Sequence, residues 1–338
     1  MKKNKIIRSL CYFAEKPDEK IIEKLDVAQK KLLNHRYSIQ TRRVCFADTS
    51  VNIADAWASD KSLLASVGSL ERKKASTQLD NFLHAADISF SLDLTSGVER
   101  EDVDLLFRII QCSPEKTFNF AFTFSNSPSS PYFPSATFEK EGFGIGLQPL
   151  DLSDGCTILE DWLQNMKFVW NEINYIFTDE PEFLGIDSSV ASLYSGNSSL
   201  VHFVKKITGT FSKSVTTDIY LRITDFIKKE NPVPLGLCGL MLPCLEDFEL
   251  ADEYAAGNFP IERNLFLAMH SGPGIDTYPI GINESRDRVY EILSLLQKLS
   301  AKYGKSLAAR FVSDGKAKIG EKTCFKNKFL KDVVVREL

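Results

Sequence analysis

Short apolar segments alternate with longer amphipathic segments along most of this chain. IIRSLCYF (6–13) and TFNFAFTF (117–124) have strand patterns, the second because apolar and polar residues alternate strictly. In residues 18–34 the apolar positions recur every three or four residues, which predicts an amphipathic helix. The N-terminal part of the chain therefore predicts strands that are separated by helices.

The same pattern continues to the C-terminal part. Further strands are expected at 38–47, 87–94, 142–150, 306–312 and the start of 234–248. Helices are expected at 60–86, 100–111, 157–172, 200–208, 217–230, 248–256, 260–269 and 284–303. Residues 174–199 are expected to form a loop with a short strand, and 270–281 a glycine-rich loop.

Strands that alternate with helices require crossover connections, so the sheet should be largely parallel. The pattern gives about eight to ten strands, which is more than an open doubly wound sheet usually carries. We therefore expect an α/β protein with a closed or nearly closed β/α barrel of about ten strands. No segment marks a domain boundary, so residues 1–338 should form a single domain.

Composition and charge exclude several classes of protein. Hydrophobic residues make up 43% of the chain and charged residues 25%, which is typical of a folded globular protein. The formal net charge of -4 disfavours a nucleic-acid partner. No apolar segment approaches the ~20 residues of a membrane-spanning helix, and no signal-peptide pattern follows the basic start. The 7 cysteines are scattered without a CxxC pair, which favours reduced, buried thiols and a cytoplasmic location.

Acidic residues follow two apolar strand-like segments. Asp187 follows LGI, and Glu246 follows LMLPCL. Carboxylates at the ends of parallel strands point to where α/β sites form, so both are candidate metal ligands, and Glu246 is also a candidate general base. Alternatively, Glu246 only stabilises the first turn of the next helix. Asp179, Glu180 and Glu182 are more typical of a solvated loop.

HSGPGIDTYPIGINES (270–285) is the third candidate site. Gly272 and Gly274 allow a ligand to approach the backbone closely, and Asp276 follows them. Asn283 lies just before the helix expected at 284–303, whose N-terminus would favour an anion. The alternative is a tight turn followed by a helix cap, with no ligand.

Arg42 and Arg43 could bind an anion with their planar guanidinium groups, although a surface salt bridge is expected for at least one of them. The hydroxyl and aromatic residues of 125–138 either contact a substrate or form a packed loop. The sequence contains no Gly-x-Ser-x-Gly motif and no cysteine–histidine arrangement, so nothing supports nucleophilic hydrolysis.

Several segments occur in an order that resembles domain-of-unknown-function family seven-eleven. They are IIRSLCYF with QTRR, SPYFPSATF with GFGIGLQ, FLGIDSSVAS, MLPCLED, HSGPGIDTYPIG and SLAARFV. The resemblance implies a ten-stranded β/α barrel similar to that of pyruvate formate-lyase, divalent-metal binding and a weak phosphatase-type activity. By the match of motifs, the acidic positions that carry over from the family to this chain are Asp187, Glu246 and Asp276. At TYPIG the chain lacks an acidic position of the family pattern. Asn283 and Glu284, which follow this run, are the candidates to replace it.

The leading hypothesis is therefore a phosphatase-like hydrolase for a small anionic substrate that depends on Mg²⁺, Mn²⁺ or Ca²⁺. Asp187, Glu246 and Asp276 would hold the metal, with Glu246 and Asp276 also catalytic. Gly272, Gly274, Asn283 and Arg42 would bind the substrate. The alternatives are a non-catalytic small-molecule sensor and a homo-oligomer whose contact uses the aromatic residues of 131–138. Glycyl-radical chemistry at Gly315 with Cys238 or Cys244 is disfavoured, because the motif around Gly315 is absent.

Overall fold

The computed structural model describes residues 5–59, 61–125 and 129–338. The elements of the N-terminal half are β1 (Lys5–Ala14), α1 (Lys20–Asn34), β2 (Tyr37–Ile39), β3 (Arg42–Phe46), α2 (Val51–Ala58), β4 (Leu64–Leu70), α3 (Arg72–His84), β5 (Ile88–Asp93), α4 (Arg100–Cys112), the 3-10 helix η1 (Pro114–Asn119) and β6 (Phe120–Phe124). Helices follow most of these strands, as the alternating pattern predicts.

The C-terminal half continues the alternation with shorter strands. Its elements are β7 (Gly142–Leu147), the 3-10 helix η2 (Pro149–Ser153), α5 (Leu159–Ile176), β8 (Phe183–Asp187), β9 (Val190–Ala191), the 3-10 helix η3 (Gly196–Ser198), α6 (Leu200–Thr208), α7 (Phe211–Ser214), α8 (Ile219–Glu230), β10 (Leu240–Met241), α9 (Phe248–Ala255), α10 (Ile261–His270), β11 (Gly274–Pro279), α11 (Arg286–Tyr303) and β12 (Leu307–Val312). No helix among the described residues is long and apolar enough to cross a membrane.

Strands from both halves form one sheet that mixes parallel and antiparallel pairs. Its strand order is β11-β12-β6-β5-β4-β3-β1-β7-β8, and β2 pairs with the N-terminal part of β1. All neighbours are parallel except β1 with β7 and β12 with β6, which are antiparallel. The sheet is thus largely parallel, as expected from the crossover connections.

The ladder of hydrogen bonds along this strand order does not close into a ring. β11 and β8 lie at its two ends, and β10 pairs only with β9 in a separate two-stranded sheet. Segment 233–244 lies between the two ends and contacts both through isolated bridges, Ile186 with Pro234 and Pro243 with Asp276. The expected α/β class is confirmed, whereas the closed barrel is not.

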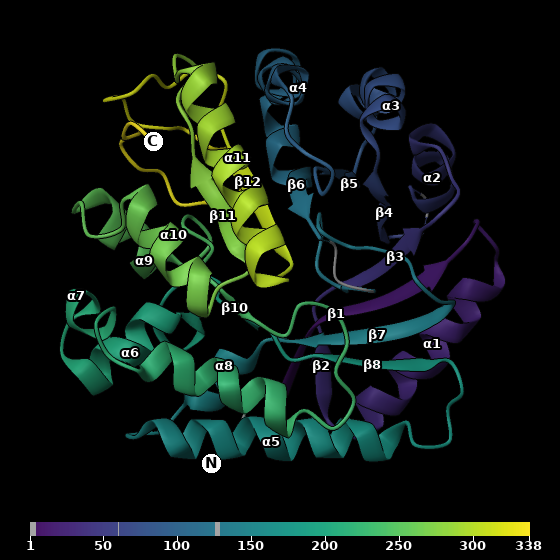
Figure 1. Cartoon of the computed structure of the whole chain (residues 1–338). Coiled ribbons are helices and arrows are strands. Elements are labelled where there is room, and N and C mark those ends of the chain that lie inside the picture. Colours follow the sequence, from purple (N-terminus) through teal and green to yellow (C-terminus); the bar gives the residue numbers. More distant parts are fainter. Residues whose placement is uncertain (1–4, 60, 126–128) are drawn as a thin grey trace.

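Helices cover the outside of the strands, which fan around the centre of the molecule (Figure 1). In α1 the buried residues Ile21, Leu25, Ala28 and Leu32 follow the predicted helical spacing and belong to the main core. On β3, Val44 and Phe46 belong to the same core, whereas Cys45 belongs to a second, smaller cluster. Alternation along each strand therefore separates a helix-covered face from an inner face, and the inner face carries the candidate site.

The region expected as one helix over 60–86 is divided between two elements. Leu64–Leu70 is the buried strand β4, and only Arg72–His84 is the helix α3. Ala65 and Val67 have no charged neighbours on either side within β4, which suits a strand that is buried on both faces. The expectation was wrong because a short apolar segment fits a buried strand as well as a helix.

The expected glycine-rich loop at 270–281 is also wrong, since residues Gly274–Pro279 form the edge strand β11. Gly274 has a φ of +129°, and a Cβ placed there would lie 1.9 Å from the carbonyl oxygen of Ala308. The glycine is thus required by the close approach of β11 to β12. Conversely, a strand was expected at the start of 234–248, but within this segment only Leu240–Met241 forms one.

Candidate functional site

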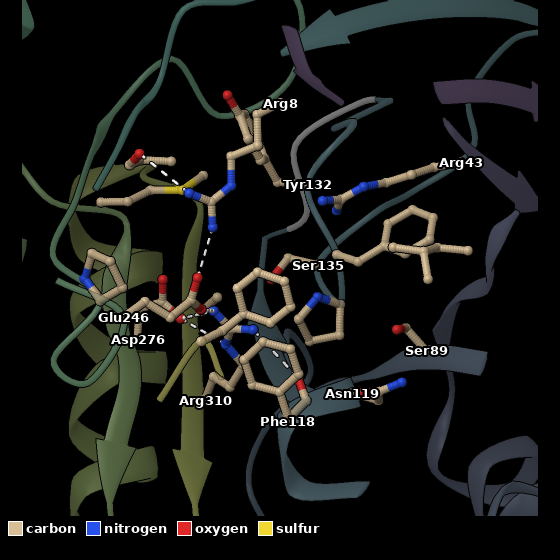
Figure 2. A pocket seen from close by; sticks show the side chains of 18 of the residues that line it. Arg8, Arg43, Ser89, Phe118, Asn119, Tyr132, Ser135, Glu246, Asp276 and Arg310 are labelled. Atoms are coloured by element: carbon tan, nitrogen blue, oxygen red, sulfur yellow. Dashed lines mark hydrogen bonds and ion pairs between the residues drawn. The ribbon is translucent and has the colours of Figure 1, made fainter. Parts of the chain in front are cut away.

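A partly open cavity of about 370 Å³ lies on the inner face of the sheet. Its polar lining comes from many parts of the chain: Arg8, Arg43, Ser89, Asn119, Ser135, Glu246, Asp276 and Arg310. Figure 2 shows Arg43, Ser89 and Asn119 on one side of the view and Glu246, Asp276 and Arg310 on the other. The volume lies near the lower end of the ~300–1,000 Å³ that small-molecule sites usually occupy.

Two of these side chains are aimed by irregularities in the strands that carry them. The register of β1 against β7 shifts between Ile7 and Ser9, and Arg8 lies at the shift. The register of β11 against β12 shifts between Ile275 and Tyr278, at Asp276. Such irregularities re-aim side chains and are common beside functional sites.

A charged network occupies one side of the cavity. Arg8 Nη2 lies 2.7 Å from Glu246 Oε2, and Arg310 Nη2 lies 2.5 Å from Glu246 Oε1. Arg310 also donates through Nε to Asp276 Oδ1 at 2.7 Å. Arg310 thus holds both carboxylates, and its planar group is well suited to such shared pairing.

Aromatic rings fix the planes of two arginines. The Arg310 guanidinium lies 5.0 Å from the ring centre of Phe118, and the Arg43 guanidinium lies 5.1 Å from that of Phe133. Arginine stacks on aromatic faces and keeps its hydrogen-bond donors free at its edge. The cavity therefore presents pre-oriented donors on both sides.

Arg43 differs from the other two arginines because it lacks an acidic partner. Its side chain is 9% exposed, and Nε donates to Thr41 Oγ1 at 2.9 Å. Among the described residues, no carboxylate lies within salt-bridge distance of Arg43. Burial lowers the pKa of Arg43 to about 10, and the positive charge of Arg8 acts in the same direction. Arg43 is thus a buried cation without a matching anion.

Arg42, the arginine predicted to bind substrate, does not line the cavity. Its Nη2 lies 2.7 Å from Asp26 Oδ1 of α1, on the helix-covered face of the sheet. Because side chains alternate along β3, only one of the two neighbouring arginines can face inward. The expectation that one of them forms a salt bridge holds for Arg42, and Arg43 takes the cavity position.

Asp276 keeps one oxygen available to the cavity. Arg310 engages Oδ1, whereas no described donor reaches Oδ2, and the side chain is 20% exposed. Burial raises the pKa of the Asp276 carboxyl, Arg310 opposes this, and Glu246 raises it further. Asp276 and Glu246 therefore meet at Arg310, as the sequence predicted for these two residues.

Asp187 is fully buried and holds a turn together. Its Oδ1 accepts from the backbone N–H of Ser189 at 2.9 Å and of Cys238 at 3.1 Å. Its Oδ2 accepts from the N–H of Leu237 at 3.0 Å and from the Ser130 hydroxyl at 3.4 Å. No contact joins Asp187 to Glu246 or Asp276 in the described part of the chain.

The three predicted metal ligands do not converge in this arrangement. Asp187 bonds backbone N–H groups, while Glu246 and Asp276 already face the positive charges of Arg8 and Arg310, which would repel a divalent cation. In the residues that the structure describes, no group of three or more histidine, cysteine or acidic residues is arranged to hold a metal ion. The metal site remains a prediction without geometric support.

The remaining predicted ligand-binding residues have packing roles. A Cβ on Gly272 would lie 3.2 Å from Ala268 Cα, so this glycine permits close packing on α10. Gly274 lines the cavity but is required by its contact with β12. Asn283 accepts from the backbone N–H of Ile319 at 2.9 Å and lies outside the cavity lining.

The N-terminus of α11, expected to bind an anion, is occupied by the chain itself. Ser285 caps it by accepting from the N–H of Arg288, and Glu284 accepts from the N–H of Leu338. The helix cap that the alternative interpretation predicted is therefore present, whereas its tight turn is replaced by β11.

Other candidates from the sequence take structural positions. Glu180 and Glu182 pair with Lys31 and Lys24 of α1, as a solvated loop would. Five cysteines are buried, and all seven are free. A Cβ on Gly315 would lie 2.6 Å from Pro114 Cγ, so packing accounts for the glycine that a radical site would need.

The aromatic residues of 131–138 do not form an exposed contact surface. Tyr132 is buried, and both Tyr132 and Phe133 line the cavity. The expectation that these aromatic residues are exposed is therefore wrong, and a homo-oligomer stays a prediction. The packed-loop and substrate-contact interpretations of this segment are compatible with each other. Residues 126–128 of the segment lie outside the described residues.

Arg8 and Arg310 were missed as site residues, although each leaves a signal in the sequence. Arg8 interrupts the apolar segment IIRSLCYF, and Arg310 interrupts SLAARFV. A single arginine inside a buried strand is costly unless it has a partner or a ligand. Which acidic residues would serve as partners could not be read from the sequence.

Comparison with known proteins leaves the activity open. No curated protein matches the chain. Residues 162–326 match the model of a family described as Uncharacterised ACR (DUF711), which confirms the resemblance to family seven-eleven. The matched part includes Glu246, Asp276 and Arg310, and leaves out Arg8 and Arg43. Over residues 162–326 the chain is thus similar to DUF711, a family of uncharacterised proteins.

Proposed function

We propose that the protein binds a small organic anion in this cavity and that Arg43 binds the anionic group. The observation that supports this most directly is the unpaired charge of Arg43. A buried charge is costly unless it is paired, so natural proteins keep one mainly where a ligand supplies the counter-charge. A carboxylate or a phosphate monoester would meet the planar donors of Arg43.

The charge balance of the cavity supports an anionic ligand. Inside, the three guanidinium groups of Arg8, Arg43 and Arg310 face the two carboxylates of Glu246 and Asp276. The acidic residues Asp87 and Glu115 also line the cavity, but they are exposed, where water and salt screen their charge. The buried Lys116 also lines the cavity, and the charges of Asp87 and Glu115 act on it, so Arg43 is the cation left without an acidic partner.

Replacement of Arg43 tests this proposal. We expect Arg43→Met to weaken binding of hexanoate and hexyl phosphate by roughly 10–100-fold, because a hydrogen bond to a charged group contributes about 1.5–3 kcal/mol. Calorimetric titration measures the affinities, and Arg42→Met is the matched control, since Arg42 lies next in sequence on the opposite face. Equal loss of affinity in both variants, or no loss in either, would contradict the role of Arg43.

Asp276 is the group that we assign to proton exchange with the bound anion. Its Oδ2 faces the cavity without a donor, and burial raises the pKa of this carboxyl, which makes it a stronger proton acceptor than an exposed aspartate. Glu246 has both oxygens engaged by arginines and would act as a positioning residue. Without such chemistry, the same cavity would serve a small-molecule sensor.

A metal-dependent hydrolase would require the arginines to release their carboxylates. We therefore expect Mn²⁺ and Mg²⁺ to leave the melting temperature of the protein unchanged within error, because a ligand stabilises a fold only when it binds the folded state. Differential scanning calorimetry with and without each ion measures this. An increase in melting temperature with Mn²⁺ that disappears in Asp276→Ala would restore the metal hypothesis.

We further propose that segment 233–244 makes the sheet a nearly closed barrel. In support, the N–H of Ile186 in β8 donates to Val233 at 2.8 Å, and the N–H of Cys244 donates to Asp276 in β11 at 2.9 Å. These bonds join the two end strands of the sheet through one intervening segment. Closure of this kind would shield part of the inner face from solvent, where the cavity lies.

A further inference from the structure

The polar groups that line the cavity without a partner limit the class of ligand. Arg43 accounts for an anionic group, but four other groups also face the cavity. Among the described residues no hydrogen bond engages the hydroxyls of Ser89 and Ser135, and Asp276 Oδ2 has no donor. Asn119 donates through Nδ2 to Ile88 at 3.2 Å, which leaves its Oδ1 as an acceptor without a donor.

We propose that the ligand is a small polyhydroxylated anion, such as a sugar acid or a sugar phosphate. This inference rests on the proposed function, because it assigns the anionic group of the ligand to Arg43. It adds that hydroxyl groups of the ligand satisfy Ser89, Asn119, Ser135 and Asp276.

The unpaired acceptors carry the argument. As a carboxylate and an amide oxygen, Asp276 Oδ2 and Asn119 Oδ1 only accept, and a ligand that displaces water from either one without donating a hydrogen bond loses about 1–3 kcal/mol. A plain carboxylate or phosphate ester brings no donor, so it would leave both acceptors unsatisfied. A ligand hydroxyl can donate to an acceptor and accept from a serine hydroxyl at the same time.

The positions of these groups require several hydroxyls. Ser89 belongs to β5, Asn119 to η1, Ser135 to the loop before β7 and Asp276 to β11. In Figure 2, Ser89 and Asn119 lie on one side of the view and Asp276 on the other, with Ser135 between them. One hydroxyl cannot reach both sides, so donors must be spread along the ligand.

Charge favours hydroxyl donors over an ammonium group. Near Asp276, the two carboxylates are already balanced by Arg8 and Arg310. An added cation would leave this region positively charged beside the unpaired Arg43, in a setting where burial strengthens the repulsion. Neutral donors avoid this cost.

Four probes, which form two matched pairs, test the inference by calorimetric titration. Gluconate and hexanoate share six carbons and a carboxylate, and glucose 6-phosphate and hexyl phosphate share six carbons and a phosphate ester. We expect the hydroxylated member of at least one pair to bind at least ~10-fold tighter, because two or more hydrogen bonds of about 0.5–1.5 kcal/mol each are gained. The pair that shows this difference distinguishes a carboxylate from a phosphate as the anionic group.

The double variant Ser89→Ala/Ser135→Ala assigns the difference to the cavity. It should weaken the hydroxylated probe by about 10-fold and leave its plain partner unchanged, since each serine contributes about 0.5–1.5 kcal/mol. Ser76→Ala/Thr77→Ala on the exposed face of α3 is the control, because both hydroxyls bond only within their own helix.

The outcomes separate the two proposals. If the plain and hydroxylated anions bind equally and Arg43→Met weakens both, the hydroxyl inference fails and the anion site stands. If 6-aminohexanoate binds tighter than gluconate, the ligand carries a cation and the hydroxyl inference fails. If none of the probes binds, both proposals are overturned.

Discussion

Replacing Arg310 with alanine is expected to lower the free energy of unfolding by about 3–5 kcal/mol at pH 7.5, since it leaves buried charge uncompensated. Arg310 is buried and pairs with Glu246 at 2.5 Å and with Asp276 at 2.6 Å. Without it, Asp276 would lose its arginine partner while Glu246 kept only Arg8. Urea unfolding monitored by circular dichroism measures the change.

The loss of unfolding free energy in Arg310→Ala should depend on pH. This dependence shows whether the loss comes from unpaired charge or from lost packing. With Arg310 absent, burial and the neighbouring Glu246 would raise the folded-state pKa of Asp276 above its unfolded value of about 3.9. A carboxyl with a raised folded pKa favours folding below its unfolded pKa, and this contribution is lost as pH rises through the folded pKa. The variant should therefore be less destabilised at pH 5 than at pH 7.5.

Arg100→Ala is the matched control for this effect. Arg100 pairs with Asp287 on the surface, with both side chains exposed. Surface pairs contribute about 0–1 kcal/mol, so the control should unfold almost like the unmodified protein at both pH values. An Arg310→Ala variant whose loss is the same at pH 5 and pH 7.5 would show that packing, and not the carboxylate pair, explains the role of Arg310.

Gly274→Ala is expected to lower the free energy of unfolding by more than about 3 kcal/mol, in the range of overpacking combined with backbone strain. The added methyl group would lie 1.9 Å from the carbonyl oxygen of Ala308, and the φ of +129° is one that other residues rarely adopt. β11 would have to move away from β12, which also carries Arg310. Thermal unfolding and the yield of folded protein measure the effect.

The control variant Gly97→Ala separates backbone strain from overpacking. Gly97 has a φ of +140°, close to that of Gly274, but a Cβ there meets nothing within 4 Å. The control should therefore report backbone strain alone, of about 1–3 kcal/mol. If both variants lose the same stability, the close approach of β11 to β12 is not the reason for Gly274.

Arg42 and Arg43 show how far the sequence leads at the site. Their pattern predicted that one arginine would form a salt bridge and that an arginine here could bind an anion, but it favoured Arg42 for the anion. Which of two adjacent strand residues faces inward depends on the tertiary contacts of β3. Here Arg42 forms a salt bridge with Asp26 of α1 and therefore faces the helix. A shift of one residue exchanges the two faces, so the choice belongs to tertiary structure.

The three predicted acidic residues have different roles, and tertiary contacts are again the reason. Glu246 and Asp276 lie 30 residues apart in the sequence, and the resemblance to family seven-eleven pointed to both. Asp187 was grouped with them, yet its oxygens hold the backbone of Leu237 and Cys238. Sequence shows which carboxylates follow apolar strands, but only coordinates show which donors satisfy them.

By itself, the sequence determined the alternation of strands and helices, the largely parallel sheet and the resemblance to DUF711. These features depend on local periodicity and on motifs, which are written along the chain. Tertiary structure alone decided that β4 is a strand, that Arg43 faces the cavity, and that Arg8 and Arg310 neutralise the two carboxylates. Each of these results depends on contacts between residues far apart in sequence, where burial and pairing outweigh local preference.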